Sequence, residues 1–482
     1  MKLNSNRVSR ATLALALVLF PAIALAELRL PSVISDHMVL QQRTTAKVWG
    51  WADAGAAVTV TPNWEGAHPA TATADADGRW LAMVVTPVAG GPYSIMIAAG
   101  DDSRVINDVL VGEVWLCGGQ SNMEWPLQAG VIEGDSARAA ANHPRLRFFD
   151  VPHTNTPGPQ ADCEGEWRVC TPESVDSFSA VGYFFGRRLL TDLDVPIGLI
   201  GSNWGGSIAE AWMSGESLHA LGGYGEALDH LDLASRDAET ALSEETRRVD
   251  EWWEKLDERD GGVAAGFNSP DFDDATWPTV PTPGHWKIEE LAAFDGVVWL
   301  RVAFDAPASW QDSPLTLELG PIDDMDTTWL NGVIVGKTHE SDQWQTRRRY
   351  DVPAGVIRTG RNVLSIRVVD LMGGGGLYDA DQPVRVFSAG RERDAISLAG
   401  EWRYHIGAPL ARLQPLPWQR TSPTSTPTVM FNGMIAPLTN YAIHGVIWYQ
   451  GESNRNHAAE YERVFAALIR DWRRQWGFEF PF

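Results

Sequence analysis

A serine lies in a glycine-rich turn directly after an apolar run that has the character of a β-strand. The run covers residues 109–117, and Gly118-Gly119-Gln120-Ser121-Asn122-Met123 follows it. A serine on such a turn exposes its hydroxyl, and backbone N–H groups of the turn can stabilise the negative oxygen that develops when a carbonyl is attacked. The pattern therefore suits nucleophilic chemistry by Ser121, although an ordinary polar turn would use the same residue types.

Two further motifs follow strand-like runs. Ser202-Asn203-Trp204-Gly205-Gly206-Ser207 comes after residues 197–201, and its two glycines would let the backbone approach a ligand closely. Trp448-Tyr449-Gln450-Gly451-Glu452-Ser453-Asn454 completes the run 445–449 and adds amides and a carboxylate. Open α/β sheets bind ligands at the carboxyl ends of their strands. A tight turn explains the first motif equally well, and a helix cap by Ser453 or Asn454 explains the second.

The segments between these motifs predict the elements that position them. Residues 178–193 have a helical stripe formed by Val181, Phe184, Phe185 and Leu189. Strand, helix and strand in that order indicate a parallel α/β sheet. Residues 457–476 predict another amphipathic helix after the third motif.

Other regions read as short strands separated by turn residues, which is typical of β-sandwiches. We therefore expect an α/β fold in which a parallel, flavodoxin-like hydrolase domain follows a β-sandwich and is interrupted by an inserted β-domain. Residues 415–427 are rich in proline, serine and threonine and are interpreted as a linker. The expected units are an export signal (1–26), a β-sandwich (27–110), the first hydrolase part (111–235), a helical connector (236–265), the insertion (266–411) and the second hydrolase part (412–482).

The first 26 residues have the pattern of a cleaved export signal. Lys2, Arg7 and Arg10 precede an apolar run at 11–22, and small residues at 24–26 suit a signal peptidase. The run is shorter than the ~20 residues that a helix needs to cross a bilayer. We therefore expect an exported protein, periplasmic or extracellular, without membrane attachment after cleavage.

The net charge and the cysteine and histidine spacing argue against nucleic acid and structural zinc as partners. Removing the three cations of the signal lowers the formal net charge from −23 to −26, which disfavours nucleic acid as a partner. Cys163 and Cys170 would close a small loop in an oxidising compartment, and a reduced pair is the alternative. Cys117 suits a buried apolar position. No cysteine or histidine spacing is typical of structural zinc, so no metal is expected.

Taken together, these motifs resemble the sialate O-acetylesterase family, a branch of the SGNH hydrolases. The resemblance covers nearly all of the chain after the signal. Residues 266–411 also resemble the jelly-roll sugar-binding domain of family 2 glycoside hydrolases, on Trp329-Leu330-Asn331-Gly332. The segments that carry the family resemblance are 35–41, 114–123, 204–206, 210–212, 433–438 and 448–454.

The resemblance implies a two-step acyl transfer. Ser121 would attack an acetyl ester of a sugar, and water would then release acetate. The N–H groups of Ser121 and Gly206 would hold the oxyanion, with a side-chain amide from Gln450 or Asn454. The residues expected to support the motifs are Gln120, Asn122 and Glu452. No cofactor is implied. Acetylated sialic acid and acetylated xylan both remain possible substrates, and a non-catalytic sugar-binding protein is the alternative from another class.

The family's catalytic histidine stands in a late Asp-x-x-His-Pro block, and this sequence has no such block. Asp150-Val151-Pro152-His153 matches only the first part of the pattern and precedes the second motif. His444 and His457 lie outside the expected position as well. We therefore identify no catalytic histidine and expect a member that is truncated at its C-terminus. Oligomeric state is left open.

Overall fold

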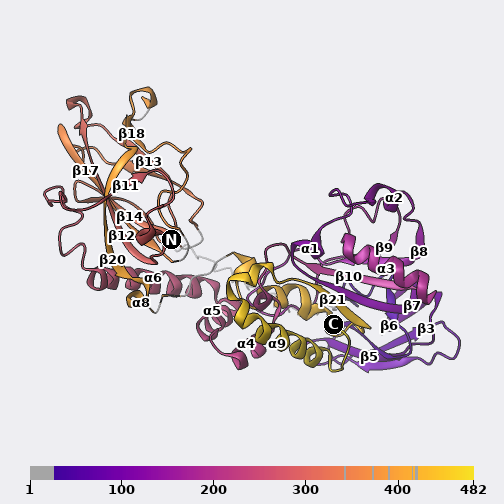
Figure 1. The fold of residues 1–482 in the computed structure, drawn as a ribbon. Coiled ribbons are helices and arrows are strands. Elements are labelled where there is room, and N and C mark those ends of the chain that lie inside the picture. Colours follow the sequence, from indigo (N-terminus) through magenta and orange to yellow (C-terminus); the bar gives the residue numbers. More distant parts are fainter. Residues whose placement is uncertain (1–26, 341–342, 372–373, 389–390, 415, 418–421) are drawn as a thin grey trace, which may run out of the picture.

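The structure, a computed structural model, describes residues 27–482 apart from 341–342, 372–373, 389–390, 415 and 418–421. The expected export signal and part of the expected linker lie outside the described residues. Figure 1 shows two lobes, one that combines helices with a twisted sheet and one, drawn in orange, that is built mainly of strands. The helix-containing lobe holds all three motifs.

The longest strand, β7 (Asp102–Gly119), organises the first lobe. Its first half pairs antiparallel with β6 (Gly90–Ala99), and its second half pairs parallel with β10 (Ile197–Asn203) and β21 (Gly445–Tyr449). The described residues thereby form one nine-stranded mixed sheet. Residues 109–114 of β7 are all buried, as expected for a strand covered on both faces. β7 runs without a break across the boundary expected at residue 110.

The parallel α/β arrangement predicted around the motifs is confirmed. β10 lies between β7 and β8 (His143–Asp150) and is parallel to both, whereas β9 (Trp167–Cys170) is antiparallel at the edge. Helix α3 (Ala180–Leu193) leads into β10, and α9 (Ala458–Trp476) follows the third motif. The carboxyl ends of β7, β10 and β21 therefore meet at one edge of the sheet (Figure 1).

The predicted stripe of α3 is confirmed for Phe184, Phe185 and Leu189, which are partly buried against the core, but not for Val181. Val181 is 38 % exposed, whereas Gly182, Tyr183 and Gly186 are buried. A β-carbon at Gly186 would lie 2.6 Å from a methyl group of Leu199 on β10, so a larger residue there would require the Leu199 side chain to move. Hydrophobic periodicity missed the fully buried positions because two of them are glycines, which carry no apolar side chain.

The remaining elements are those of the first lobe, together with the long helix α6 that follows it. The N-terminal strands β2 and β5 pair with each other as a separate two-stranded sheet. The remaining bounds are β1 (Val39–Gln41), β2 (Thr45–Trp51), β3 (Ala57–Pro62), β4 (Ala70–Thr73), β5 (Arg79–Val85), α1 (Ser121–Glu124), α2 (Gly134–Ala139), η1 (Ala209–Trp212), α4 (Gly215–Leu221), α5 (Gly225–Arg236), α6 (Ala238–Asp260), η5 (Pro423–Ser425), η6 (Phe431–Ile435), η7 (Ala436–Leu438) and η8 (Glu452–His457).

The second lobe consists of two antiparallel sheets. One has the strand order β11-β20-β12-β17-β14-β15, and the other β16-β13-β18-β19. Their bounds, with those of the short helices, are β11 (Thr279–Thr282), α7 (Glu289–Ala292), β12 (Gly296–Ala306), η2 (Ala308–Trp310), β13 (Leu315–Pro321), β14 (Met325–Leu330), β15 (Val333–Thr338), β16 (Arg347–Val352), β17 (Gly360–Asp370), β18 (Arg385–Ser388), η4 (Glu392–Asp394), β19 (Ile396–Ser397), β20 (Gly400–Pro409) and α8 (Leu410–Leu413).

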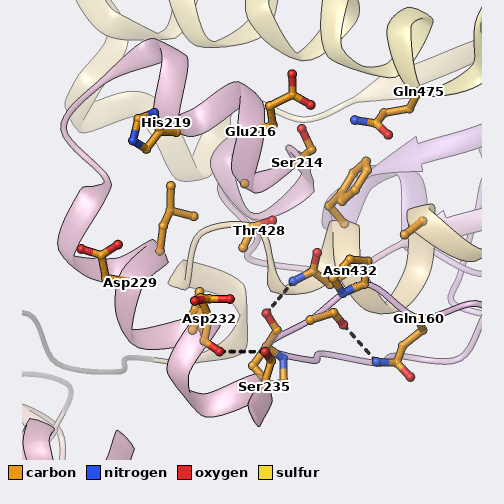
Figure 2. Close-up of a pocket in the computed structure, with 18 of the residues that line it drawn as sticks. Gln160, Ser214, Glu216, His219, Asp229, Asp232, Ser235, Thr428, Asn432 and Gln475 are labelled. Carbon is orange, nitrogen blue, oxygen red and sulfur yellow. Dashed lines mark hydrogen bonds between the residues drawn. The ribbon is translucent and has the colours of Figure 1, made fainter.

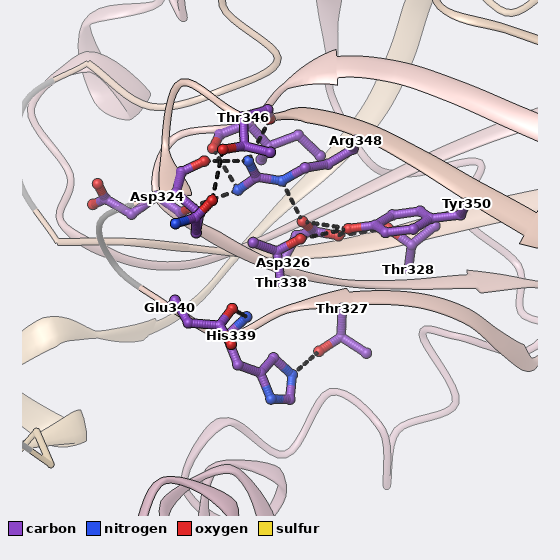
Figure 3. Close-up of polar contacts among 12 residues, drawn as sticks. Asp324, Asp326, Thr327, Thr328, Thr338, His339, Glu340, Thr346, Arg348 and Tyr350 are labelled. Atoms are coloured by element: carbon purple, nitrogen blue, oxygen red, sulfur yellow. Dashed lines mark hydrogen bonds and ion pairs between the residues drawn. The ribbon is translucent and has the colours of Figure 1, made fainter. Parts of the chain in front are cut away.

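A buried ion pair joins these two sheets. Arg348 on β16 donates to Asp326 on β14 at 2.9 Å, and neither side chain is more than 1 % exposed (Figure 3). Thr328 and Tyr350 also donate to the Asp326 carboxylate, at 2.8 Å and 3.0 Å. A buried ion pair is tolerated only when hydrogen bonds satisfy its charged atoms, and this network meets that requirement.

Helix α6 attaches the second lobe to the first. Trp252 and Trp253 on α6 pack in one apolar cluster with Trp299 and Trp329 of the strand-built lobe. The indole of Trp299 donates to Asp260, also on α6, at 2.7 Å. The helix therefore belongs structurally to the lobe that follows it.

The described residues contain three cysteines, and all of them are free and buried. Cys163 and Cys170 are not bonded to each other. Burial raises the pKa of Cys163 to about 12, so its thiol stays protonated at neutral pH. No described helix is long and apolar enough to cross a membrane. Within the same residues, no three histidine, cysteine or acidic side chains are grouped to hold a metal ion.

Candidate active site

The turn after β7 exposes Ser121 and buries its neighbour. Ser121 begins helix α1 and is exposed, whereas Gln120 is only 3 % exposed. Gly119 has φ +140°, and a β-carbon there would lie 2.2 Å from the Tyr449 carbonyl oxygen. Glycine is therefore required at 119, because the backbone passes directly against β21.

The second motif lies directly beside Ser121. A β-carbon on Gly205 would lie 3.4 Å from the Ser121 β-carbon. The Gly205 N–H donates to Glu124, which stands one helical turn after Ser121, at 2.5 Å. Gly206 has φ +77° and borders open space, and within the described residues no acceptor is hydrogen-bonded to its N–H. This N–H group is consequently available to a ligand.

The third motif is tied to the first by two supporting side chains. The side-chain oxygen of Gln120 accepts hydrogen bonds from the N–H groups of Gly451 and Ser453, both at 3.2 Å. The amide of Asn122 donates to Glu452 at 2.6 Å. The supporting residues expected from sequence thus hold the turn around Ser121 against the end of β21.

The two candidate amides, Gln450 and Asn454, contact each other. Gln450 donates to the Ser207 carbonyl at 3.0 Å and to Asn454 at 2.7 Å, which uses both hydrogens of its amide. Asn454 is 3 % exposed, accepts from the Ala209 N–H at 3.0 Å, and donates to Glu210 at 2.9 Å. Asn454 therefore retains one N–H that no described hydrogen bond uses.

The histidines singled out from sequence lie in three different places. His444 precedes β21 at the end of the strand away from Ser121, where it pairs with Glu113 at 2.6 Å. His457 precedes α9 and is exposed. His153 stacks on Trp204 with ring centroids 4.2 Å apart and pairs with Glu124 at 3.0 Å. Of these histidines, His153 is the one that contacts immediate neighbours of Ser121.

Asp150 takes no part in this contact, although it stands three residues before His153. It is ion-paired with Arg168, on the neighbouring strand β9. Burial raises the pKa of Asp150 to about 6, and Arg168 opposes this shift. The short sequence match to Asp-x-x-His is therefore not an aspartate–histidine pair, because His153 is held by Glu124.

Two carboxylates of this site, those of Glu124 and Glu210, were not identified as site residues from sequence. Glu124 contacts both Gly205 and His153, and Glu210 holds Asn454 and accepts from Tyr224 at 3.3 Å. The three-residue spacing between Ser121 and Glu124 is helical, so that spacing could have revealed Glu124. Glu210 lies in the segment 210–212 that carries the family resemblance, but its contact with Asn454 could not be read from sequence, since that partner is 244 residues away.

Two fifths of this chain is similar in sequence to known proteins. No family model matches it. Sialate O-acetylesterase from Rattus norvegicus is 33 % identical over 211 residues, which cover 40 % of this chain and 39 % of that protein. The Homo sapiens enzyme of the same name is 34 % identical over 212 residues, 40 % of each chain. The chain is a homologue of the sialate O-acetylesterases.

The homology spans about two fifths of the length of these curated relatives. A crystal structure of a carbohydrate acetylesterase from Xanthomonas citri is also similar, with 24 % sequence identity and a TM-score of 0.49. The similarity covers 94 % of this chain and 58 % of that one.

Proposed function

We propose that this homologue of the sialate O-acetylesterases is a carbohydrate O-acetylesterase with Ser121 as its nucleophile. The observation that carries the proposal is the convergence of three sequence-distant motifs around one exposed serine. Gly205 lies against Ser121, and Gln120 and Asn122 bind the motif of β21. The SGNH form of the hydrolase part, the N-terminal β-sandwich and the jelly-roll form of the second lobe belong to the same proposal.

The reaction proceeds by acyl transfer. The hydroxyl oxygen of Ser121 attacks the acetyl carbonyl carbon while its proton passes to a base, and the carbonyl oxygen becomes an oxyanion. Collapse of the intermediate breaks the bond to the sugar oxygen, which takes up a proton and leaves as the alcohol. Water then attacks the acetyl–serine ester in the same manner and releases acetate.

Three N–H groups are the proposed oxyanion donors. Those of Ser121 and Gly206 belong to the backbone, and the third is the side-chain amide of Asn454. Gln450 is left out because both of its amide hydrogens are already donated. Loss of one such donor typically costs about 2.7–4 kcal/mol of transition-state stabilisation.

His153 is the proposed base within the described chain. Glu124 holds one ring nitrogen at 3.0 Å, which leaves the other nitrogen to accept a proton. The stack on Trp204, the residue before Gly205, fixes the plane of the ring. This role differs from the family pattern, which uses a histidine from the late Asp-x-x-His-Pro block.

The proposed substrate is an acetylated sugar, and two classes must be compared. Acetate release would be measured from O-acetylated sialic acid, from acetylated xylan and from a nitrophenyl acetate, with native protein and Ser121→Ala. We expect turnover of the nitrophenyl ester to fall at least about a thousandfold in Ser121→Ala. Equal turnover of the nitrophenyl ester by native protein and Ser121→Ala would refute the proposal. The faster release of acetate from sialic acid or from xylan would identify the substrate class.

Export to the periplasm or the cell exterior is proposed from the first 26 residues. It agrees with the expected access to glycans outside the cytoplasm. Mass spectrometry of the mature N-terminus after expression in a Gram-negative host would test it, with cleavage after Ala26 expected. An intact Met1 on the bulk of the protein would contradict this part of the proposal.

A further inference from the structure

The second lobe has a pocket whose charge is opposite to that of the protein as a whole. The chain has 62 acidic and 39 basic residues, and a cavity of the first lobe follows this balance, with Glu216, Asp229 and Asp232 in its lining (Figure 2). The pocket of the second lobe, about 260 Å³ in volume, is instead lined by four arginines and one glutamate. The arginines of this arginine pocket are Arg347, Arg348, Arg349 and Arg385.

The pairing of three neighbouring strands brings these side chains together. On β13, Glu318 lies opposite Arg349 of β16 on one side and opposite Arg385 of β18 on the other. Arg349 donates to one oxygen of Glu318 at 2.8 Å, and Arg385 donates to the other at 2.7 Å. Arg347 precedes Arg349 by two residues and therefore lies on the same face of β16. One carboxylate thus stands among three guanidinium groups.

The arginine pocket consequently has a surplus of positive charge. The charge of Arg348 is compensated by its buried ion pair with Asp326, and Glu318 compensates one of the three other arginines. No described residue forms a hydrogen bond or an ion pair with the side chain of Arg347. Like charges that border one small pocket repel each other, and an anion bound among them would relieve this repulsion.

The guanidinium groups are held in place and are still accessible to a ligand. Those of Arg349 and Arg385 lie over the buried ring of Phe387, at 5.8 Å and 5.1 Å from its centroid. The Arg349 side chain is 60 % exposed and that of Arg385 is 32 % exposed. In the described contacts each uses one of its five N–H groups, for Glu318. The remaining N–H groups can form the paired hydrogen bonds that a planar carboxylate accepts from arginine.

The segments that form the pocket wall also present aromatic rings. Trp344, three residues before Arg347, is 40 % exposed, and its ring centroid lies 5.8 Å from that of Tyr378. Tyr378 stands four residues before the lining residue Gln382, and the ring of His285 stacks on it at 5.2 Å. The apolar face of a sugar ring packs on such rings, and the Gln382 amide can bind sugar hydroxyls. These groups favour an anionic sugar over an inorganic ion.

We propose that the arginine pocket binds a sugar residue that carries a carboxylate, either a uronic acid or a sialic acid. The two sugars offer the same chemistry, a carboxylate for the arginines and a ring with hydroxyls for Trp344 and Gln382. The inference rests on the proposed function, because a glycan is the ligand expected of a carbohydrate esterase. It gives the second lobe a role in glycan attachment that is separate from the ester attacked by Ser121.

Monosaccharides that differ only in their charge test the inference. Isothermal titration of the full-length protein at low salt would compare glucuronic acid with glucose, and N-acetylneuraminic acid with its methyl ester. We expect saturable binding of at least one acid, and at least about tenfold weaker binding of its uncharged counterpart. The acid that binds more tightly identifies the sugar class.

Three variants then locate the binding site. Arg347→Gln and Arg385→Gln should each raise the Kd of the preferred acid at least about tenfold. The control is Arg393→Gln, because Arg393 is an exposed arginine of η4 in the same lobe and does not line the pocket. This control should bind with native affinity. Since Arg347 is exposed and has no described partner, its substitution should leave the melting temperature unchanged, so unfolding would not explain a loss of binding.

The opposite outcomes are equally specific. Absence of binding by both acids, or equal affinity for each acid and its uncharged counterpart, would overturn the inference. So would native affinity in Arg347→Gln and Arg385→Gln, or Arg347-dependent binding of inorganic sulfate that is tighter than binding of either acid. The proposed function is tested separately by Ser121-dependent release of acetate from nitrophenyl acetate, which carries no carboxylate for this pocket.

Discussion

Replacing Asn454 with aspartate should destabilise the folded protein strongly and in a pH-dependent manner. In the native structure the Asn454 amide donates to the Glu210 carboxylate at 2.9 Å, with Asn454 only 3 % exposed. Asn454→Asp places two carboxylates at that distance. At an effective dielectric constant of about 20, two like charges about 4 Å apart repel by about 4 kcal/mol.

The repulsion can cost no more than the free energy needed to protonate one of the two carboxyls, because the protonated pair carries a single charge. A carboxyl with an ordinary pKa of about 4.3 takes up a proton at pH 7 at a cost of about 3.7 kcal/mol. The shared proton raises the pKa of the folded pair above its unfolded value. The folded variant therefore binds more protons than the unfolded chain, so its stability falls as pH rises from about 4 to 7. The deficit should be about 3–4 kcal/mol at pH 7 and small near pH 4.

Urea unfolding of native protein, Asn454→Asp, Glu210→Gln and the double variant would measure these differences. In the double variant the new amide at position 210 can donate to the new carboxylate at position 454, so we expect most of the lost stability to return. Turnover of nitrophenyl acetate should not return, because the proposed oxyanion donor at 454 is still missing. A single variant within about 1 kcal/mol of native at pH 7, or an equal loss at both pH values, would refute the reasoning.

Two further variants address the surroundings of Ser121. In Gly205→Ala the added methyl would lie 2.9 Å from a Glu124 oxygen. We therefore expect kcat/KM to drop at least about tenfold, with little change in melting temperature. An unchanged kcat/KM would show that the contact between Gly205 and Glu124 is not needed. His153→Phe retains a ring to stack on Trp204 but loses the Glu124 contact and the proposed base. The kcat of this variant should fall about 10²–10⁴-fold, whereas the control His457→Phe should match native protein. A normal rate in His153→Phe would exclude His153 as the base.

Local patterns predicted the elements and the arrangement of the motifs. The apolar run before Ser121 pairs in parallel with the runs before Ser202 and Gln450. The first two runs are almost wholly buried, as expected for strands in the middle of a parallel sheet, whereas the run before Gln450 pairs on one side only among the described strands. The start of α3 was expected near Phe178 and lies at Ala180, where Ser179 accepts a hydrogen bond from the Gly182 N–H. That difference is small, since a serine cap fixes the helix start locally.

Contacts between distant segments could not be predicted in the same way. Glu210 meets Asn454, and Glu124 meets His153, only because the folded sheet brings their segments together. Hydrophobic periodicity also placed Val181 on the buried face of α3, although Val181 is 38 % exposed and Gly182 and Gly186 are buried. Sequence patterns report the environment of a segment, whereas these partners depend on tertiary geometry.

The continuous strand β7 has a consequence for how the first lobe holds together. Its antiparallel half hydrogen-bonds to β6, and its parallel half ends two residues before Ser121. A cut at residue 110 would divide one run of backbone and leave unpaired edges on both fragments. Ser121, the proposed nucleophile, therefore shares a cooperative folding unit with the N-terminal strands, so partial unfolding of those strands would loosen the turn that presents it.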